Sequence, residues 1–137
     1  MALFDTEKLV KATDFADVCK GTVQITGKIG FSEGAANLMK LERGCALMLS
    51  ELPEGGFAAV VVNSSEYPDA FAVRKSGKYC SISMKGYFER HNIPYADRSI
   101  RIIYDIIETD EQYEGRTVYR WTKRTRKRTT QEFDEEY

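Results

Sequence analysis

Apolar and polar residues alternate along most of this chain, in short runs separated by turn residues. Alternation with a period of two is typical of half-buried β-strands. Glycine-containing segments lie between consecutive runs at Pro53-Glu54-Gly55-Gly56 and Ser76-Gly77, and each predicts a β-hairpin. A polar turn is predicted around Asp110–Gly115. The strand-like runs are Thr22–Phe31, Cys45–Leu52, Phe57–Ser64, Ala70–Lys75, Lys78–Ser83, Ser99–Glu108 and Thr117–Arg124.

Short helices are predicted where this alternation breaks down. Ser32 predicts an N-cap for residues 33–41, with Leu38 and Leu41 facing inward, and Ser83 predicts one for residues 84–92. The first twenty residues predict one or two more, with Asp5 or Thr6 and then Thr13 or Asp14 as caps. Their face toward the core would consist of Leu3, Leu9, Val10, Phe15 and Val18. The whole pattern predicts an α+β fold dominated by antiparallel β-hairpins with two short helices after these N-terminal ones.

A weak internal repeat divides the predicted elements into two halves. Gly27-Lys28-Ile29 leads through Ser32 into a helix and a hairpin, and Gly77-Lys78-Tyr79 leads through Ser83 into the same order. Half of a small sheet cannot bury its own apolar face, so two such units would share one core. The pattern is compatible with a duplicated β-α-β-β unit over residues 22–64 and 70–124, or with two independent stretches. We expect one domain over residues 1–128 and a tail over residues 129–137.

Charge is strongly segregated near the C-terminal end, although the 137-residue chain has a net charge of only −1. Residues 116–128 carry seven Lys or Arg side chains and no acid, whereas residues 131–137 carry four acids and no base. The rest of the chain is mildly acidic. A polyanionic partner would therefore be bound locally, at the basic segment, and not by the whole surface.

The basic segment also contains two aromatic residues, Tyr119 and Trp121. Strand alternation places them with Lys123 on one face, and Val118, Arg120, Thr122 and Arg124 on the other. An exposed aromatic face would be a stacking platform for bases, and the alternative is that both rings belong to the core. The candidate nucleic-acid-binding residues are Arg116, Tyr119, Arg120, Trp121, Lys123, Arg124, Arg126, Lys127 and Arg128.

The segment Gly27–Leu47 resembles the core of the AbrB/MazE swapped-hairpin family. The resemblance consists of a Gly-Lys-Ile start, an apolar residue and a cap, a short helix that ends in leucine, then glycine and a strand. Ser32 stands where that family usually has proline, and Ala36 stands where many members carry an arginine that helps to bind duplex DNA. Residues 78–93 and the hairpins before them resemble, in topology, the positive-cofactor-four and Whirly single-strand binders. Both resemblances imply nucleic-acid binding by an intertwined homo-oligomer, a dimer or larger.

Catalytic and metal-binding signals are weak in this sequence. The single histidine, His91, falls at a predicted helix end, and the three cysteines lack metal-ligand spacing. We predict no enzymatic activity, no metal and no cofactor. Free buried thiols, no signal peptide and no apolar run near 20 residues predict a cytoplasmic protein with no membrane partner.

Two functions follow as expectations. The first is non-specific binding of nucleic acid, with single-stranded DNA favoured, through the basic segment and under competition from the acidic tail. Acidic tails that end in an aromatic residue resemble those of single-stranded DNA-binding proteins; the alternative for the tail is solubilisation alone. The second function is that of an oligomeric structural or interaction protein, such as an accessory or phage-type assembly factor. In that protein the oppositely charged termini of neighbouring subunits would pair.

Overall fold

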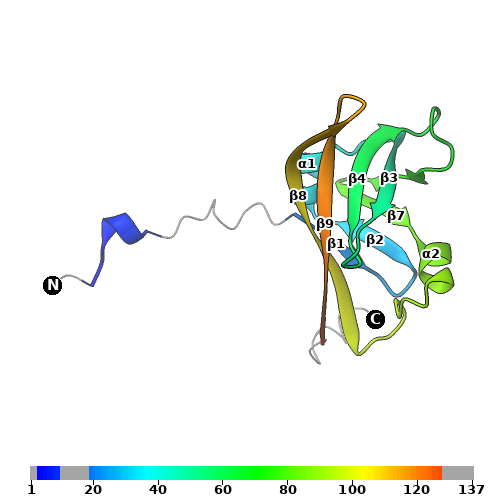
Figure 1. Cartoon of the computed structure of the whole chain (residues 1–137). Helices are drawn as coiled ribbons and strands as arrows, with labels where there is room; N and C mark the ends of the chain where they lie inside the picture. The colour runs from blue at the N-terminus through cyan, green and yellow to red at the C-terminus, as the bar shows by residue number, and fades with distance from the viewer. Residues whose placement is uncertain (1–2, 10–18, 128–137) are drawn as a thin grey trace.

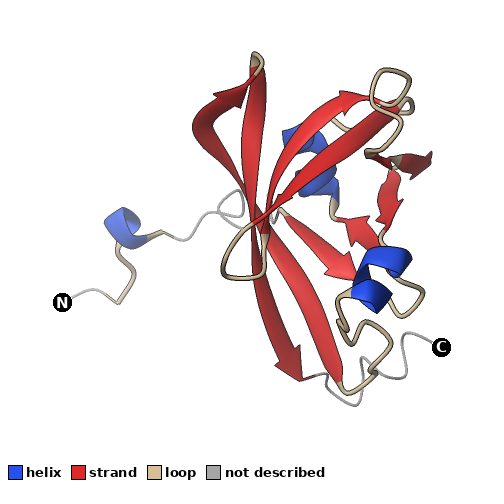
Figure 2. Cartoon of the chain, turned by 45° about the vertical axis from the view of Figure 1, so that its right-hand side comes forward, coloured by secondary structure: helices blue, strands red, loops and turns tan. Residues whose placement is uncertain are grey.

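The computed structural model describes residues 3–9 and 19–127, about half of which belong to one antiparallel sheet (Figures 1 and 2). Nine strands form the sheet in the order β5-β3-β4-β9-β8-β1-β2-β7-β6. Two α-helices, α1 (Glu33–Met39) and α2 (Lys85–Arg90), complete an α+β fold. The strands are β1 (Lys20–Val23), β2 (Lys28–Phe31), β3 (Cys45–Glu51), β4 (Phe57–Asn63), β5 (Phe71–Ala72), β6 (Arg74–Ser76), β7 (Tyr79–Ser83), β8 (Ile100–Tyr113) and β9 (Arg116–Lys127).

One short segment nearly closes this sheet into a barrel. Strand β5 pairs with β3 at one edge of the sheet, and β6 pairs with β7 at the other. Only Val73 separates β5 from β6 in the chain, and its side chain is buried. The strands at the two sheet edges are therefore only two and three residues long.

The predicted hairpins are present, with two changes in their extent. Gly55 and Gly77 adopt positive φ in the turns before β4 and β7, as the sequence predicts. The predicted strand from Thr22 is instead two strands, β1 and β2, which turn at Gly27. Residues 110–113, predicted as a turn, belong to β8. That strand ends at Tyr113 because the turn is made by Glu114 and Gly115, both at positive φ.

Of the two predicted serine caps, only one is formed. The Ser32 Oγ accepts a hydrogen bond from the Ala35 N–H at 3.2 Å and so caps α1, and Leu41 beyond this helix is buried. Ser83 is the last residue of β7, and the N-cap of α2 is Met84, which has no capping side chain. The Ser83 prediction is wrong because burial of Met84, 1% exposed, fixes where the helix begins.

The N-terminal segment does not pack as the sequence predicts. A 3₁₀ turn, η1 (Thr6–Lys8), is capped by Asp5, whose carboxylate accepts a hydrogen bond from the Glu7 N–H at 2.9 Å. Leu3 and Leu9 are exposed and η1 contributes nothing to the core, so the predicted docking is wrong for these residues. The second predicted helix, with Thr13 and Asp14 as caps, lies outside the described residues.

Alternate side chains of the strands fill the barrel interior. The largest fully buried ones include Trp121, Tyr104, Ile29 and Leu47, and Phe88 of α2 joins the same core. A second, smaller apolar cluster lies on the outer face of β3, β4 and β9, formed by Ala46, Val60, Val62 and Val118. Tyr67 and Ala70 from the loop after β4 pack against it.

The strand order has an approximate two-fold pattern. In the first half β1 pairs with β2 and β3 with β4, and in the second half β6 pairs with β7 and β8 with β9. The pairing of β1 with β8 in turn corresponds to the pairing of β5 with β3. The pairs β2·β7 and β4·β9 relate one half to the other. This pattern concerns neighbour relations only, and the internal duplication itself stays a prediction.

Candidate polyanion-binding face

The two aromatic residues of β9 are core residues and offer no exposed ring. Trp121 is fully buried and Tyr119 is 6% exposed. Trp121 makes edge-on contacts with Phe31 and Phe57, with ring centroids 5.4 and 6.2 Å apart. The hypothesis that Tyr119 and Trp121 stack on bases is therefore corrected. Strand alternation predicts their common face, and the barrel encloses that face.

Burial also determines the chemistry of the phenols inside the barrel. Burial, and secondarily Glu108, raises the pKa of Tyr119, whose hydroxyl donates a hydrogen bond to the Leu38 carbonyl at 3.2 Å. Burial raises the pKa of Tyr104 further, with a smaller effect of Tyr87. The Tyr104 hydroxyl and the Trp121 Nε1 have no hydrogen-bond partner among residues 3–9 and 19–127.

The outward side chains of β9 share one face of the sheet with further cations on β8, β1 and β2. Across the β8·β9 pair, Arg124 lies opposite Ile103 and Arg126 lies opposite Arg101. Across β1·β8, Lys20 lies opposite Asp105. We define the basic face as Lys20, Lys28, Arg101, Asp105, Arg124 and Arg126, whose formal charge is +4. The excess of cations on this face would attract an anionic partner.

Arg120 and Arg124 of β9 form exposed ion pairs with acids of other elements. Arg124 Nε lies 2.7 Å from Asp105 Oδ2, and both side chains are nearly half exposed. Arg120 pairs with Glu54 of the β3–β4 turn. Exposed pairs of this kind contribute about 0–1 kcal/mol, so an incoming phosphate can replace the carboxylate of Asp105 at little cost.

The other predicted basic residues lie elsewhere. Lys123 and Lys127 are on the opposite side of β9 from Arg124, because each is an odd number of residues away from it. Arg128 lies outside the described residues. The nine predicted residues thus do not form one site, and Arg124 and Arg126 are the two that belong to the basic face.

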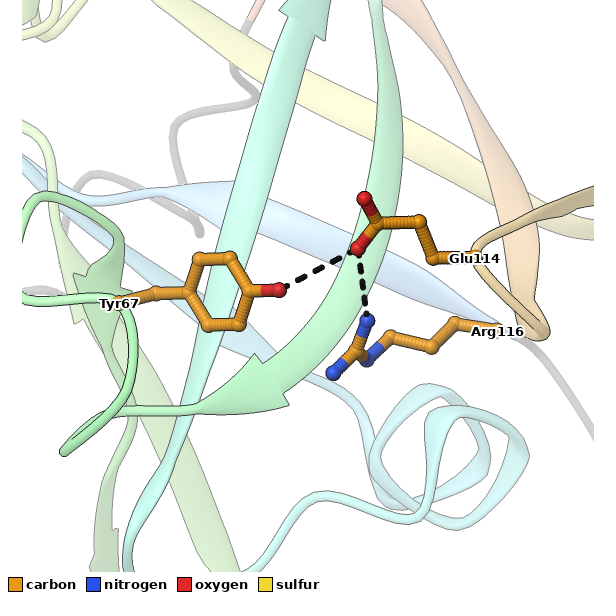
Figure 3. A network of polar contacts seen from close by, with 3 residues as sticks. All are labelled: Tyr67, Glu114 and Arg116. Atoms are coloured by element: carbon orange, nitrogen blue, oxygen red, sulfur yellow. Dashed lines mark hydrogen bonds and ion pairs between the residues drawn. The ribbon is translucent and has the colours of Figure 1, made fainter.

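Arg116 contacts both the turn of the β8–β9 hairpin and the loop after β4 (Figure 3). Its guanidinium lies 3.4 Å from Glu114 Oε2 and 5.4 Å from the centre of the Tyr67 ring. The Tyr67 hydroxyl donates a hydrogen bond to the same carboxylate oxygen at 3.4 Å. This arrangement gives Arg116 a structural role that the linear sequence does not reveal.

A cleft of about 540 Å³ opens on the outer face of β1, β2 and β8, beside the basic face. Among the described residues that line it, the polar side chains are hydroxyls, one amide and two cations, and none is acidic. The lining residues are Lys20, Thr22, Gln24, Ile25, Thr26, Gly30, Phe31, Ser32, Tyr79 and Arg101. The absence of acid in this lining favours an anionic or neutral polar ligand over a cation.

Sequence reasoning missed the residues that this cleft shares with the basic face. Lys20 and Arg101 are isolated bases in the sequence, and only strand pairing brings them beside β9. The one available signal was the alternation in residues 99–108, which places Arg101, Ile103 and Asp105 on one face of a strand.

Metal-binding and histidine-dependent chemistry has little support in the described residues. Within residues 3–9 and 19–127, no three His, Cys, Asp or Glu side chains are grouped so that they could hold a metal ion. His91 is the C-cap of α2, as its predicted helix-end position indicates, and it stacks on Tyr87 with ring centroids 4.2 Å apart.

No helix in the described part of the chain is both long enough and apolar enough to cross a membrane. Comparison of the chain with protein-family models, with curated proteins and with solved structures found no match. The candidate site therefore rests on the geometry of the basic face and its cleft.

Proposed function

We propose that this protein binds single-stranded nucleic acid without sequence specificity, across the basic face. The observation that carries the proposal is the position of Arg124 and Arg126 beside Arg101, next to a cleft whose described lining residues include two cations and no acid. Cations that converge on one exposed surface attract a phosphate backbone and release its counterions on binding. A positively charged surface that follows the backbone is typical of proteins that bind single strands without sequence preference.

Fluorescence anisotropy with a labelled deoxythymidine dodecamer tests this function. We expect a strong fall in affinity with rising salt, because each phosphate contact on a single strand adds about 0.7 to the slope of log K against log salt. The double variant Arg124→Gln/Arg126→Gln should lower that slope by about 1.4 if each arginine neutralises one phosphate.

The matched control is Arg43→Gln/Arg90→Gln. It removes the same net charge from exposed positions near α1 and α2, away from the basic face. We expect this control to retain most of the affinity and the full salt slope. Equal losses in both double variants would mean that only net charge matters. A flat titration of the wild type at low salt would exclude the function.

The acidic tail supplies a separate expectation. Residues 131–137 carry four acids and compete with nucleic acid for the basic face. A chain shortened by residues 129–137 should therefore bind the dodecamer more tightly, with the largest gain at low salt. Unchanged binding would assign the tail to solubility alone.

A second function, as an oligomeric interaction protein, is favoured by one specific observation. The N-terminal segment carries Leu3, Phe4 and Leu9 at 106%, 73% and 51% exposure, and it lies apart from the barrel (Figure 1). A groove of about 290 Å³ on the outer face of β3 and β4 is also unfilled, with Met48, Val60 and Tyr113 in its lining. Under this function the segment of one copy fills the groove of a second copy, because both surfaces are apolar and neither is covered by the described residues of its own chain.

Sedimentation velocity over a range of protein concentrations tests this second function. Phe4→Ser should shift the chain toward monomer, whereas Lys8→Ser in the same segment should not. Apolar docking predicts a dimer that survives high salt. Pairing of oppositely charged termini predicts a dimer that dissociates in high salt. A chain that is monomeric throughout would exclude both versions.

The two-fold pattern of neighbours leads us to propose, in addition, that the barrel consists of two duplicated β-α-β-β units. The proposal is supported by the equivalent positions of α1 and α2, each of which lies between two hairpins of its own half. An experimental structure tests it by superposition of residues 20–63 on residues 71–127. Different helix orientations in the two halves would favour two independent stretches.

A further inference from the structure

Tyr79 is the exposed aromatic residue of the cleft. It begins β7 and is 43% exposed. Its hydroxyl accepts a hydrogen bond from the side-chain amide of Gln24, which follows β1 in the chain. The phenol therefore reaches across β2, the strand that lies between β7 and β1.

Gly30 of β2 provides the space in which this pair lies. A Cβ on Gly30 would be 2.5 Å from the Tyr79 hydroxyl oxygen, 2.7 Å from Gln24 Nε2 and 3.2 Å from Tyr79 Cε2. The far edge of the ring thus rests on the backbone of the sheet, while nearly half of the side chain stays open to solvent. An aromatic side chain across a strand glycine can serve to cover that glycine alone. In this cleft, however, Lys20 and Arg101 also lie beside it.

An anchored ring, an amide and two cations within one cleft match the groups of a nucleotide. A base stacks on an aromatic face whatever its identity, an amide bonds the edge of a base, and Lys or Arg contacts the phosphate. The cleft volume of about 540 Å³ lies in the usual range for small-ligand sites.

We infer that the cleft is a nucleotide subsite in which Tyr79 stacks on one base, Gln24 contacts the edge of that base, and Lys20 and Arg101 hold the adjoining phosphate. This inference rests on the proposed binding of single-stranded nucleic acid. It replaces Tyr119 and Trp121, which are buried, with Tyr79 as the stacking residue.

Two probes of equal charge separate the subsite from the basic face. One is a labelled deoxythymidine dodecamer, and the other is an abasic dodecamer with the same phosphates. We expect the wild type to bind the thymidine probe several-fold more tightly than the abasic one. Tyr79→Leu should weaken binding of the thymidine probe by about tenfold and leave the abasic probe unchanged. Tyr79→Phe keeps the ring and should retain most of that affinity.

Arg101→Gln should act differently, because it removes a phosphate contact. Both probes should bind more weakly, and the salt slope should fall by about 0.7, whereas Tyr79→Leu should leave the slope unchanged. Photo-crosslinking of a 5-iododeoxyuridine dodecamer to the wild-type chain gives a second measurement that needs no variant. Mass spectrometry should identify the crosslinked residue as Tyr79.

The outcomes distinguish the subsite from the function on which it rests. If the wild type binds both probes equally, or if Tyr79→Leu folds normally and binds as the wild type does, the subsite is wrong and the basic face stands. A crosslink at a residue outside the cleft would also overturn the subsite. If the wild type binds neither probe, the proposed function fails and the subsite fails with it.

Discussion

At the scale of single residues, two buried phenols of the barrel differ in one respect. The Tyr119 hydroxyl donates a hydrogen bond to the Leu38 carbonyl, whereas the Tyr104 hydroxyl has no partner among the described residues. A buried polar group without a partner costs free energy, and a satisfied one stabilises the fold by about 1 kcal/mol. The two side chains therefore form a matched pair for substitution.

We predict that Tyr104→Phe leaves the free energy of unfolding unchanged or raises it by about 1 kcal/mol. Tyr119→Phe should lower it by about 1 kcal/mol, because the Leu38 carbonyl then loses its donor. Urea unfolding followed by far-ultraviolet circular dichroism measures both values. A clear loss of stability in Tyr104→Phe would indicate that this hydroxyl contacts a buried water molecule or another bound group.

At the scale of elements, local sequence predicts hairpins better than helix boundaries. The turns at Gly55 and Gly77 are correctly predicted because glycine at positive φ is a local requirement. Ser32 and Ser83 look alike in sequence, yet burial of Met84 makes Ser83 a strand residue. Alternation along β9 also predicts correctly which of its side chains share a face. That the face with Tyr119 lies inside the barrel depends on strands distant in sequence, so local sequence does not reveal it.

These two serines give the element-scale prediction. Ser32→Ala should lower the free energy of unfolding by about 1–2 kcal/mol, since its Oγ accepts hydrogen bonds from the Ala35 N–H and from the Lys20 N–H at 3.1 Å. Ser83 is exposed and caps no helix, so Ser83→Ala should change the free energy of unfolding by no more than about 0.5 kcal/mol. Equal losses for the two variants in urea unfolding would contradict this assignment of the α2 start.

At the scale of the whole molecule, pairing between distant strands assembles both the core and the candidate site. Lys20 and Arg101 are 81 positions apart in the sequence, and they line one cleft because β1 pairs with β8. Composition predicts a polyanion-binding segment but not its partners on neighbouring strands. The barrel thus separates the two properties that coincide in the sequence of β9, with the aromatics inside and Arg124 and Arg126 outside.

The same enclosure predicts how the fold responds to alkaline pH. Burial raises the pKa of Tyr87, Tyr104 and Tyr119 in the folded chain, whereas in the unfolded chain each phenol ionises near pH 10. The unfolded state therefore binds fewer protons above pH 10, so the stability present below that pH is lost as the pH rises further. Phenolate absorbance near 295 nm should therefore include a cooperative rise that coincides with unfolding, when the buried phenols reach solvent. Tyr104→Phe should unfold at a higher pH than the wild type, because it removes the most strongly shifted of these phenols. A single smooth titration near pH 10, without loss of the circular dichroism signal, would show that the phenols are accessible to solvent and that the barrel does not enclose them.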